Sequence, residues 1–143
     1  MQMSVRDDLS LVQQAWVDSI NGRDREIFLK LHAENVVVYD PTVQQLKGRT
    51  ALANLFDGLF SMFPDYHIKK TRVFGQEGWV CLEVEESGTM KGPIHAGKSE
   101  IPPTGKSFRI PSSIVCYVEN GLISEVRIYY DLMGLMSQLG LGP

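Results

Sequence analysis

The sequence SFRIPSSIVCYVENGLISEVRIYY, which runs from Ser107 to Tyr130, carries the strongest structural signal in the chain. Asn120-Gly121 lies between two long runs that are rich in β-branched and aromatic residues. This dipeptide favours the tight turn that joins two antiparallel strands. The sequence therefore predicts a hairpin whose strands cover residues 107–119 and 122–130.

The region before this hairpin also reads as strands. Glu77-Gly78 indicates a second turn, between predicted strands over residues 66–76 and 79–90. Residues 92–106 contain three glycines and three prolines, so we expect a loop there. A loop of this length is a candidate lid over a cavity, with His95 as a candidate proton shuttle.

Helical patterns fill the first part of the chain. An apolar stripe with spacings of three and four predicts a helix over residues 5–20, with Ser4 as its N-cap. The stripe consists of Val5, Leu9, Val12, Trp16 and Ile20. Asp24 can begin a short second helix, and Val36–Tyr39 reads as a strand. Gly48 begins a third helical pattern, which ends before Pro64.

Helices therefore come first, a long antiparallel meander follows, and a short helix that starts near Asp131 closes the sequence. This order predicts an α+β fold, in which a cone-shaped, curved antiparallel sheet packs against three N-terminal helices and a short C-terminal helix. The inside of such a cone is a natural place for a small ligand.

Composition narrows the function classes. The chain has 143 residues, 43% of them hydrophobic, and we expect a single domain over residues 1–143. The net charge of −3 and the scattered lysines and arginines argue against a nucleic-acid partner. The apolar runs are too short to span a membrane, and the first residues contain no apolar secretion signal. Cys81 and Cys116 stand alone in separate apolar runs, as expected for free thiols in a reducing compartment. We therefore expect a cytoplasmic protein without a membrane partner, a metal site or a cofactor.

Several further stretches resemble one protein family. They are NGRD (21–24), HAENVVVYDP (32–41), GRTA (48–51), FPD (63–65) and IPPTGK (101–106). Together with the residues after Ile123, they resemble the nuclear transport factor 2-like superfamily, in particular SnoaL-like polyketide cyclases and ketosteroid isomerases. The resemblance covers nearly the whole chain and implies the cone-shaped fold. It leaves the reaction open, because this scaffold hosts isomerases, cyclases, epoxide hydrolases and non-enzymes.

Asp40 is the first candidate for chemistry. In ketosteroid isomerases the aspartate of a matching Asp-Pro pair is the general base, so the resemblance implies this role for Asp40. The residues themselves agree, because a carboxylate at the end of an apolar strand is partly desolvated and accepts a proton more readily. The alternative is that Asp40 only caps a backbone N–H in an Asp-Pro turn.

A base also needs a partner that donates a hydrogen bond to the substrate's carbonyl oxygen. The first-helix tyrosine of the isomerases falls at Trp16, their second donor falls near Ile114, and a histidine common among the cyclases falls at Met90. Tyr129 or Tyr130 could supply the missing donor, since neighbouring residues of a strand point to opposite faces. The family pattern favours Tyr129 as the inward residue, whereas the apolar alternation favours Tyr130.

Two weaker possibilities involve the end of the last strand. Asp131 could be an accessory acid at the mouth of the cone, or the N-cap of the terminal helix. Arg109 and Arg127 suggest an epoxide hydrolase, in which Asp40, Arg127 and Asp131 would form the charged relay.

We therefore expect a small cofactor-independent enzyme that acts on an apolar, carbonyl-bearing molecule by acid–base proton transfer, as an isomerase or cyclase. The expected catalytic residues are Asp40, Asp131 and Tyr129. The expected substrate-binding residues are Trp16, Phe56, Phe60, Phe63, Met90, Ile114 and Tyr130. A non-catalytic binding protein for a small hydrophobic ligand is the alternative. Val115 and Tyr117 read as outward apolar residues, so we also expect a homodimer.

Overall fold

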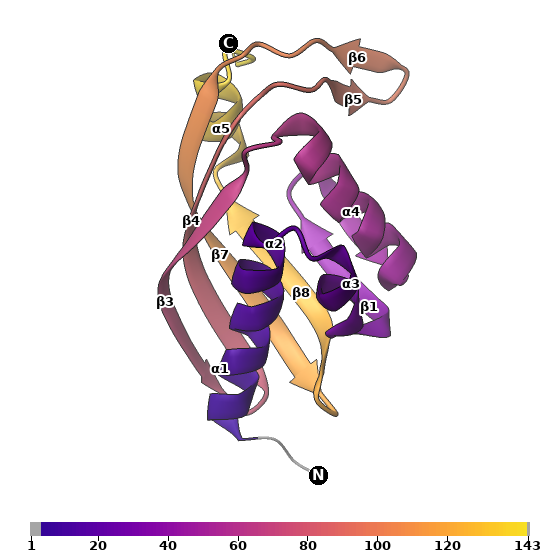
Figure 1. Cartoon of the computed structure of the whole chain (residues 1–143), viewed down its shortest axis with the longest axis vertical. Coiled ribbons are helices and arrows are strands. Elements are labelled where there is room, and N and C mark those ends of the chain that lie inside the picture. Colours follow the sequence, from indigo (N-terminus) through magenta and orange to yellow (C-terminus); the bar gives the residue numbers. More distant parts are fainter. Residues whose placement is uncertain (1–3, 143) are drawn as a thin grey trace.

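The computed structural model describes residues 4–142 as a curved sheet with helices along one side (Figure 1). The helices are α1 (Val5–Gln13), the π-helix η1 (Gln14–Asp18), α2 (Ser19–Asn21), α3 (Arg25–Lys30), α4 (Gly48–Met62) and α5 (Leu132–Gln138). The strands are β1 (His32–Asp40), β2 (Val43–Lys47), β3 (His67–Gln76), β4 (Trp79–Thr89), β5 (Ile94–Ala96), β6 (Ser99–Ile101), β7 (Ser107–Glu119) and β8 (Leu122–Tyr130). The predicted α+β class is confirmed.

Six strands form the main sheet in the order β2-β1-β8-β7-β4-β3. β1 runs parallel to β8, and the other neighbouring pairs are antiparallel. Both predicted hairpins are present, and β7 and β8 have the predicted bounds. Asn120 and Gly121 adopt φ values of 54° and 76° at the tip of the second hairpin. Positive φ at both central residues is what the favoured hairpin turn requires.

The sheet has an inner face, which the helices α1 to α4 cover, and an outer face (Figure 1). Inward residues of β7 are buried, and the set consists of Phe108, Ile110, Ser112, Ile114, Cys116 and Val118. The alternate residues Val115 and Tyr117 lie on the outer face, partly exposed, as the apolar alternation predicts. Homodimerisation through this face stays a prediction.

The N-terminal helical segment departs from a regular helix in its middle. Ser4 is the N-cap at its start, as predicted, and it forms a capping box with Asp7. Further on, the backbone N–H and the hydroxyl of Ser19 both bond to the carbonyl oxygen of Gln14, five residues earlier. A bond that spans five residues, instead of the four of an α-helix, defines the π-helix η1. Such a π-turn changes the direction in which the following side chains point. The sequence predicted an uninterrupted helix here.

Two strand pairs were not expected. β2 forms the edge of the sheet beside β1, where its polar residues need no buried face. β5 and β6 form a small separate hairpin within the segment expected to be a loop, and Figure 1 shows it projecting beyond the end of α4. Within residues 4–142, no helix combines the length and the apolar character needed to cross a membrane.

Candidate functional site

Asp40 ends β1 on the inner face, where it continues the alternation of the buried Val36 and Val38. Its Oδ1 accepts hydrogen bonds from the backbone N–H of Thr42 at 2.8 Å and from the Thr42 hydroxyl at 2.5 Å. The turn-capping alternative is therefore correct for this oxygen. Both bonds use Oδ1 rather than Oδ2, and the side chain is partly exposed.

The structure decides between the two tyrosines at the end of β8. Tyr129 lies on the outer face and is 54% exposed, whereas Tyr130 packs against the core from the inner face. The inward orientation that the family pattern suggested for Tyr129 is thus corrected. Tyr130 pairs with Ser112 across β7 and β8, in keeping with the apolar alternation. The inward phenol of this strand is Tyr130.

Glu86 is an inward acid that the sequence reasoning missed. It follows Val80, Leu82 and Val84 on the inner side of β4, and these three residues are buried. The hydroxyl of Tyr66, which is 3% exposed, donates a hydrogen bond to Oε1 of Glu86. The strict alternation of β4 was the signal, because position 86 has the same parity as the three apolar residues before it.

Burial raises the pKa of Glu86, and the negative charge of Asp40 raises this pKa further. Hydrogen bonds from Tyr66 and from Ser112 act in the opposite direction, because they stabilise the carboxylate. The Ser112 hydroxyl also lies 3.2 Å from the carbonyl oxygen of Tyr129, so its single proton is shared between two acceptors.

The two phenols of this region are held in their protonated form. Burial raises the pKa of Tyr66, and the charge of Glu86 adds to the effect. Burial likewise raises the pKa of Tyr130, with contributions from the charges of Asp40 and Glu86. A phenol in this state is a hydrogen-bond donor. We call Asp40, Tyr66, Glu86 and Tyr130 the inner acid–phenol cluster.

Asp131 is the N-cap of the terminal helix α5. Its Oδ1 accepts a hydrogen bond of 2.9 Å from the backbone N–H of Gly134, and its side chain is exposed. This is the N-cap alternative for α5. The accessory-acid role expected for Asp131 gains no support from this position.

Trp16 is buried, and its N–H is already engaged. Nε1 of Trp16 donates to Nε2 of His32 at 3.0 Å, and Nδ1 of His32 lies 2.7 Å from the carbonyl oxygen of Phe28. Since Nε2 accepts a hydrogen bond, the ring proton is on Nδ1, which donates a hydrogen bond to the carbonyl oxygen of Phe28. Burial lowers the pKa of His32 to about 4, so this histidine is neutral near pH 7. Trp16 therefore has no N–H to offer a carbonyl oxygen.

The other expected substrate-binding residues belong mostly to the core. Phe56, Phe63, Met90 and Ile114 are at most 7% exposed, and Phe60 is partly buried. Phe56 stacks between the rings of Phe28 and Phe60, at centroid distances of 5.2 and 4.9 Å. Their role as the wall of a ligand site stays a prediction.

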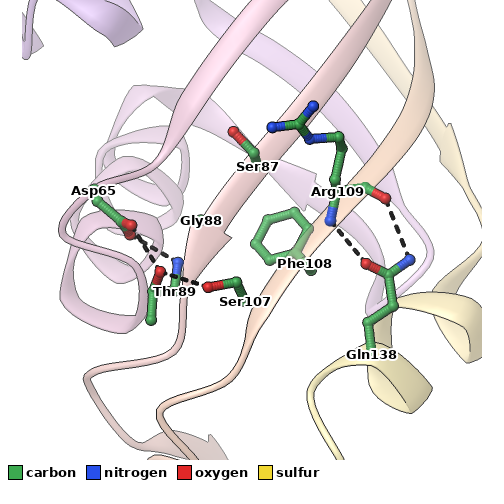
Figure 2. A pocket seen from close by; sticks show the side chains of 8 residues that line it. All are labelled: Asp65, Ser87, Gly88, Thr89, Ser107, Phe108, Arg109 and Gln138. Atoms are coloured by element: carbon green, nitrogen blue, oxygen red, sulfur yellow. Dashed lines mark hydrogen bonds between the residues drawn. The ribbon is translucent and has the colours of Figure 1, made fainter.

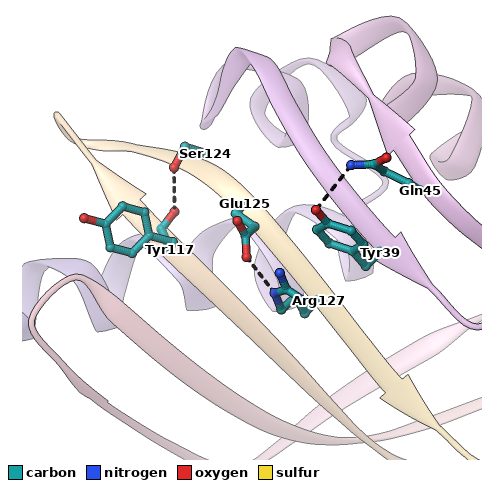
Figure 3. Close-up of polar contacts among 6 residues, drawn as sticks. All are labelled: Tyr39, Gln45, Tyr117, Ser124, Glu125 and Arg127. Atoms are coloured by element: carbon teal, nitrogen blue, oxygen red, sulfur yellow. Dashed lines mark hydrogen bonds and ion pairs between the residues drawn. The ribbon is translucent and has the colours of Figure 1, made fainter.

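The charged relay of an epoxide hydrolase is not assembled. Arg127 lies on the outer face, where it pairs with Glu125 at 2.6 Å and stacks over the ring of Tyr39 (Figure 3). Arg109 is also on the outer face and lies 3.8 Å from Glu85. Both arginines are thus on the opposite side of the sheet from Asp40.

The larger of two described hollows, about 360 Å³, lies where β4 and β7 meet α5 (Figure 2). Its lining residues are Asp65, Ser87, Gly88, Thr89, Ser107, Phe108, Arg109 and Gln138. The amide of Gln138 bonds to both the backbone N–H and the carbonyl of Arg109, at 2.7 and 3.2 Å. The second hollow, about 310 Å³, includes Glu83 and Tyr129. Neither is lined by Asp40 or Glu86, so neither is a ligand site around these two acids inside the cone.

The described part of the chain contains no cluster of metal-ligating side chains. No three His, Cys, Asp or Glu side chains gather there in a group that could hold an ion. Cys81 and Cys116 are free thiols, and Cys116 is fully buried.

Comparison with known proteins gives a family and a fold. The model of the family described as SnoaL-like polyketide cyclase matches residues 10–139. A structure named as a SnoaL-like polyketide cyclase from Jannaschia sp. CCS1 is 18% identical, with a TM-score of 0.86, and the match covers 100% of this chain and 99% of that one. TsrD from Streptomyces laurentii is 19% identical, with a TM-score of 0.83 and coverage of 98% and 99%.

An LEH-like epoxide hydrolase from M. tuberculosis is 15% identical, with a TM-score of 0.72 and coverage of 96% and 92%. Likeness at such low identity establishes the fold alone. A search of the curated proteins found no match.

Proposed function

Because the chain belongs to the family of SnoaL-like polyketide cyclases, we propose that it catalyses proton transfer on an apolar, carbonyl-bearing small molecule. The reaction would abstract a proton from the carbon next to the carbonyl group, which leads to isomerisation or to aldol-type ring closure. The proposal assigns the chemistry to side chains of the chain itself.

The inner acid–phenol cluster is the observation that carries this proposal. It combines two carboxyl groups and two protonated phenols on the face of the sheet that the helices cover. Asp40, Glu86 and Tyr130 each remain partly accessible to solvent. Acid–base catalysis needs such a set, because one group must accept a proton while another stabilises the oxygen that gains negative charge.

Asp40 has the base role in this proposal. Oδ2 takes the proton from the carbon, while the two hydrogen bonds from Thr42 to Oδ1 fix the orientation of the carboxylate. Tyr130 would donate a hydrogen bond to the carbonyl oxygen as the electron pair of the C–H bond moves into a carbon–carbon double bond. The proton returns from Asp40 to the same carbon or to another carbon of the conjugated system.

Hydrogen–deuterium exchange on 2-tetralone in D₂O, followed by proton NMR, tests the proposal without the natural substrate. We expect the wild-type protein to accelerate exchange at the carbons next to the carbonyl group. Asp40→Asn keeps an oxygen for the Thr42 turn and should lower the rate by about 10²–10⁴, as loss of a general base does. Asp18→Asn makes the same charge change on an exposed helical residue and should leave the rate unchanged. Equal rates in Asp40→Asn and wild type would rule out Asp40 as the base.

A non-catalytic binding protein is the second candidate. Ile114, which is 2% exposed, occupies the inner β7 position where the resemblance places an acid in the isomerases. This function predicts that the protein binds 2-tetralone in calorimetry, that wild type causes no exchange, and that Asp40→Asn binds as well as wild type. A cytoplasmic location and a homodimer accompany either candidate as proposals that rest on the sequence alone.

A further inference from the structure

Glu86 differs from the other glutamates of β4 in where it points and in what it contacts. Glu83 and Glu85 lie on the outer face beside the guanidinium groups of Arg72 and Arg109. Glu86 lies on the inner face and contacts the hydroxyl of Tyr66, a buried residue just before β3. Within residues 4–142, no arginine forms an ion pair with Glu86, and a buried carboxyl group in such a place is costly to ionise because no positive charge replaces the lost water.

Burial and the charge of Asp40 favour the neutral form of Glu86, and two hydrogen bonds favour its carboxylate. Asp40 on β1 raises the pKa of Glu86 through its negative charge, and burial acts in the same direction. Tyr66 and Tyr130 are neutral neighbours, since their own pKa values are raised. Only the hydrogen bonds from Tyr66 and Ser112 favour the carboxylate. When two carboxyl groups interact in this way, their environments separate them into one acid and one base.

The register of the sheet places the two carboxyl groups on either side of Tyr130 and Ser112. Glu86 lies beside Ile110 on β7, Ser112 lies opposite Tyr130 on β8, and β1 follows β8 in the sheet. β4 and β1 are three strand spacings apart, which is roughly 14 Å across the sheet, and the register places Asp40 level with Leu82, four residues along β4 from Glu86. Tyr130 and Ser112 therefore lie between Asp40 and Glu86 on the inner face of the sheet.

We propose that Glu86 is the proton donor of this site and that Tyr66 is its positioning residue. The assignment rests on the proton-transfer function proposed above. Asp40 takes the proton from the carbon, and the C–H electron pair becomes the new carbon–carbon double bond. The carbonyl π electrons form an O–H bond with the proton that Glu86 releases, which gives a neutral enol and a Glu86 carboxylate. Reversal returns the proton from the enol oxygen to Glu86.

Infrared titration of the full chain tests the protonation of Glu86 independently of any turnover. The carboxylic-acid band that Glu86→Gln removes should persist to higher pH than the band that Glu83→Gln removes. Glu83→Gln is the matched control, because this residue lies on the same strand and faces the opposite side. A Glu86 band that disappears at the same or lower pH than the Glu83 band would overturn the proposal, whether or not the protein turns over 2-tetralone.

The exchange reaction tests the donor role itself. Glu86→Gln retains the size of the side chain and an acceptor for Tyr66, and it should lower the exchange rate by about 10²–10⁴. Glu83→Gln should exchange like wild type. If Glu86→Gln matches Glu83→Gln while Asp40→Asn is inactive, the donor role is wrong and the proposed function stands. If wild type itself causes no exchange, the proposed function fails on this probe, and the infrared titration still decides the state of Glu86.

Tyr66→Phe separates positioning from a purely structural role. The lost hydrogen bond stabilised the Glu86 carboxylate, so its removal should raise the pKa of Glu86 further. Activity that depends on protonated Glu86 falls as the pH rises through this pKa. The alkaline limb of the exchange profile should therefore move to higher pH in Tyr66→Phe. A limb that stays in place, in a variant whose circular dichroism matches wild type, would contradict the positioning role.

Discussion

Glutamate side chains on the two faces of β4 have opposite surroundings. On the outer face, Glu83 lies 3.6 Å from Arg72 and Glu85 lies 3.8 Å from Arg109, and all four side chains are substantially exposed. On the inner face, Glu86 contacts a buried phenol, and burial raises its pKa. A solvated arginine favours the charged carboxylate, whereas a buried phenol and low solvent access favour the neutral acid. Residue type therefore says little about the chemistry of an acid until its face of the sheet is known.

Substitutions on the two faces of β4 should differ most in how much they lower the free energy of unfolding. Leu82 is fully buried on the inner face of β4, next to the outward Glu83. Leu82→Ala should lower the free energy of unfolding by about 2–5 kcal/mol, because it removes apolar contacts and leaves a cavity. Glu83→Ala should change it by about 0.5 kcal/mol or less. Urea unfolding followed by circular dichroism measures both, and similar losses in the two variants would contradict the assignment of faces.

The pH dependence of stability should separate the inner His32 from the outer His95. Burial lowers the pKa of His32 to about 4, whereas the side chain of His95 is 72% exposed. As the pH falls below about 6.5, the unfolded state gains a proton on His32 that the folded state takes up only near pH 4, so the folded state loses stability in this window. Between pH 7 and pH 5 the loss from His32 should be about 2 kcal/mol.

Urea unfolding at these two pH values checks the effect. His32→Gln should reduce the loss of stability between pH 7 and pH 5, and His95→Gln should leave it as in wild type. The same pH dependence in wild type and His32→Gln would show that His32 is not buried in its neutral form.

The smallest effect is expected for the ion pairs of the outer face. Arg72 and Glu83 are 72% and 39% exposed, so water and salt screen their attraction. A double-mutant cycle with Arg72→Ala and Glu83→Ala should give a coupling energy of about 0.5 kcal/mol or less, and less still in high salt. A salt-independent coupling above about 1 kcal/mol would mean that this face is more shielded from solvent than the structure shows.

The fold was largely predictable from short-range patterns. Asn120-Gly121 located the turn at which β7 ends and β8 begins, and the spacing from Val5 to Ile20 identified the first helical segment. The π-turn at Gln14 was not predicted, because the apolar spacing from Val5 to Ile20 is also that of a regular α-helix. β2 was missed for a different reason. An edge strand can be polar on both faces and then lacks an apolar alternation.

The candidate site was harder to predict than the fold. Asp40 was identified from its place after an apolar strand, and the alternation of β8 favoured Tyr130 over Tyr129 correctly. The same alternation would have placed Glu86 on the inner face, because Leu82, Val84 and Glu86 are every second residue of β4. Its contact with Tyr66, like that between Trp16 and His32, joins residues far apart in sequence, and only the assembled fold brings such residues together.

Gln138 has a consequence for how this chain behaves among its own copies. β8 ends opposite Ser112, so the first residues of β7 have no neighbouring strand on that side, and the Gln138 amide occupies the backbone N–H and carbonyl of Arg109 there. An open backbone edge is a template on which a second chain can extend the sheet. We therefore expect Gln138 to protect this edge from the addition of a strand of a second chain, and we expect its loss to favour aggregation.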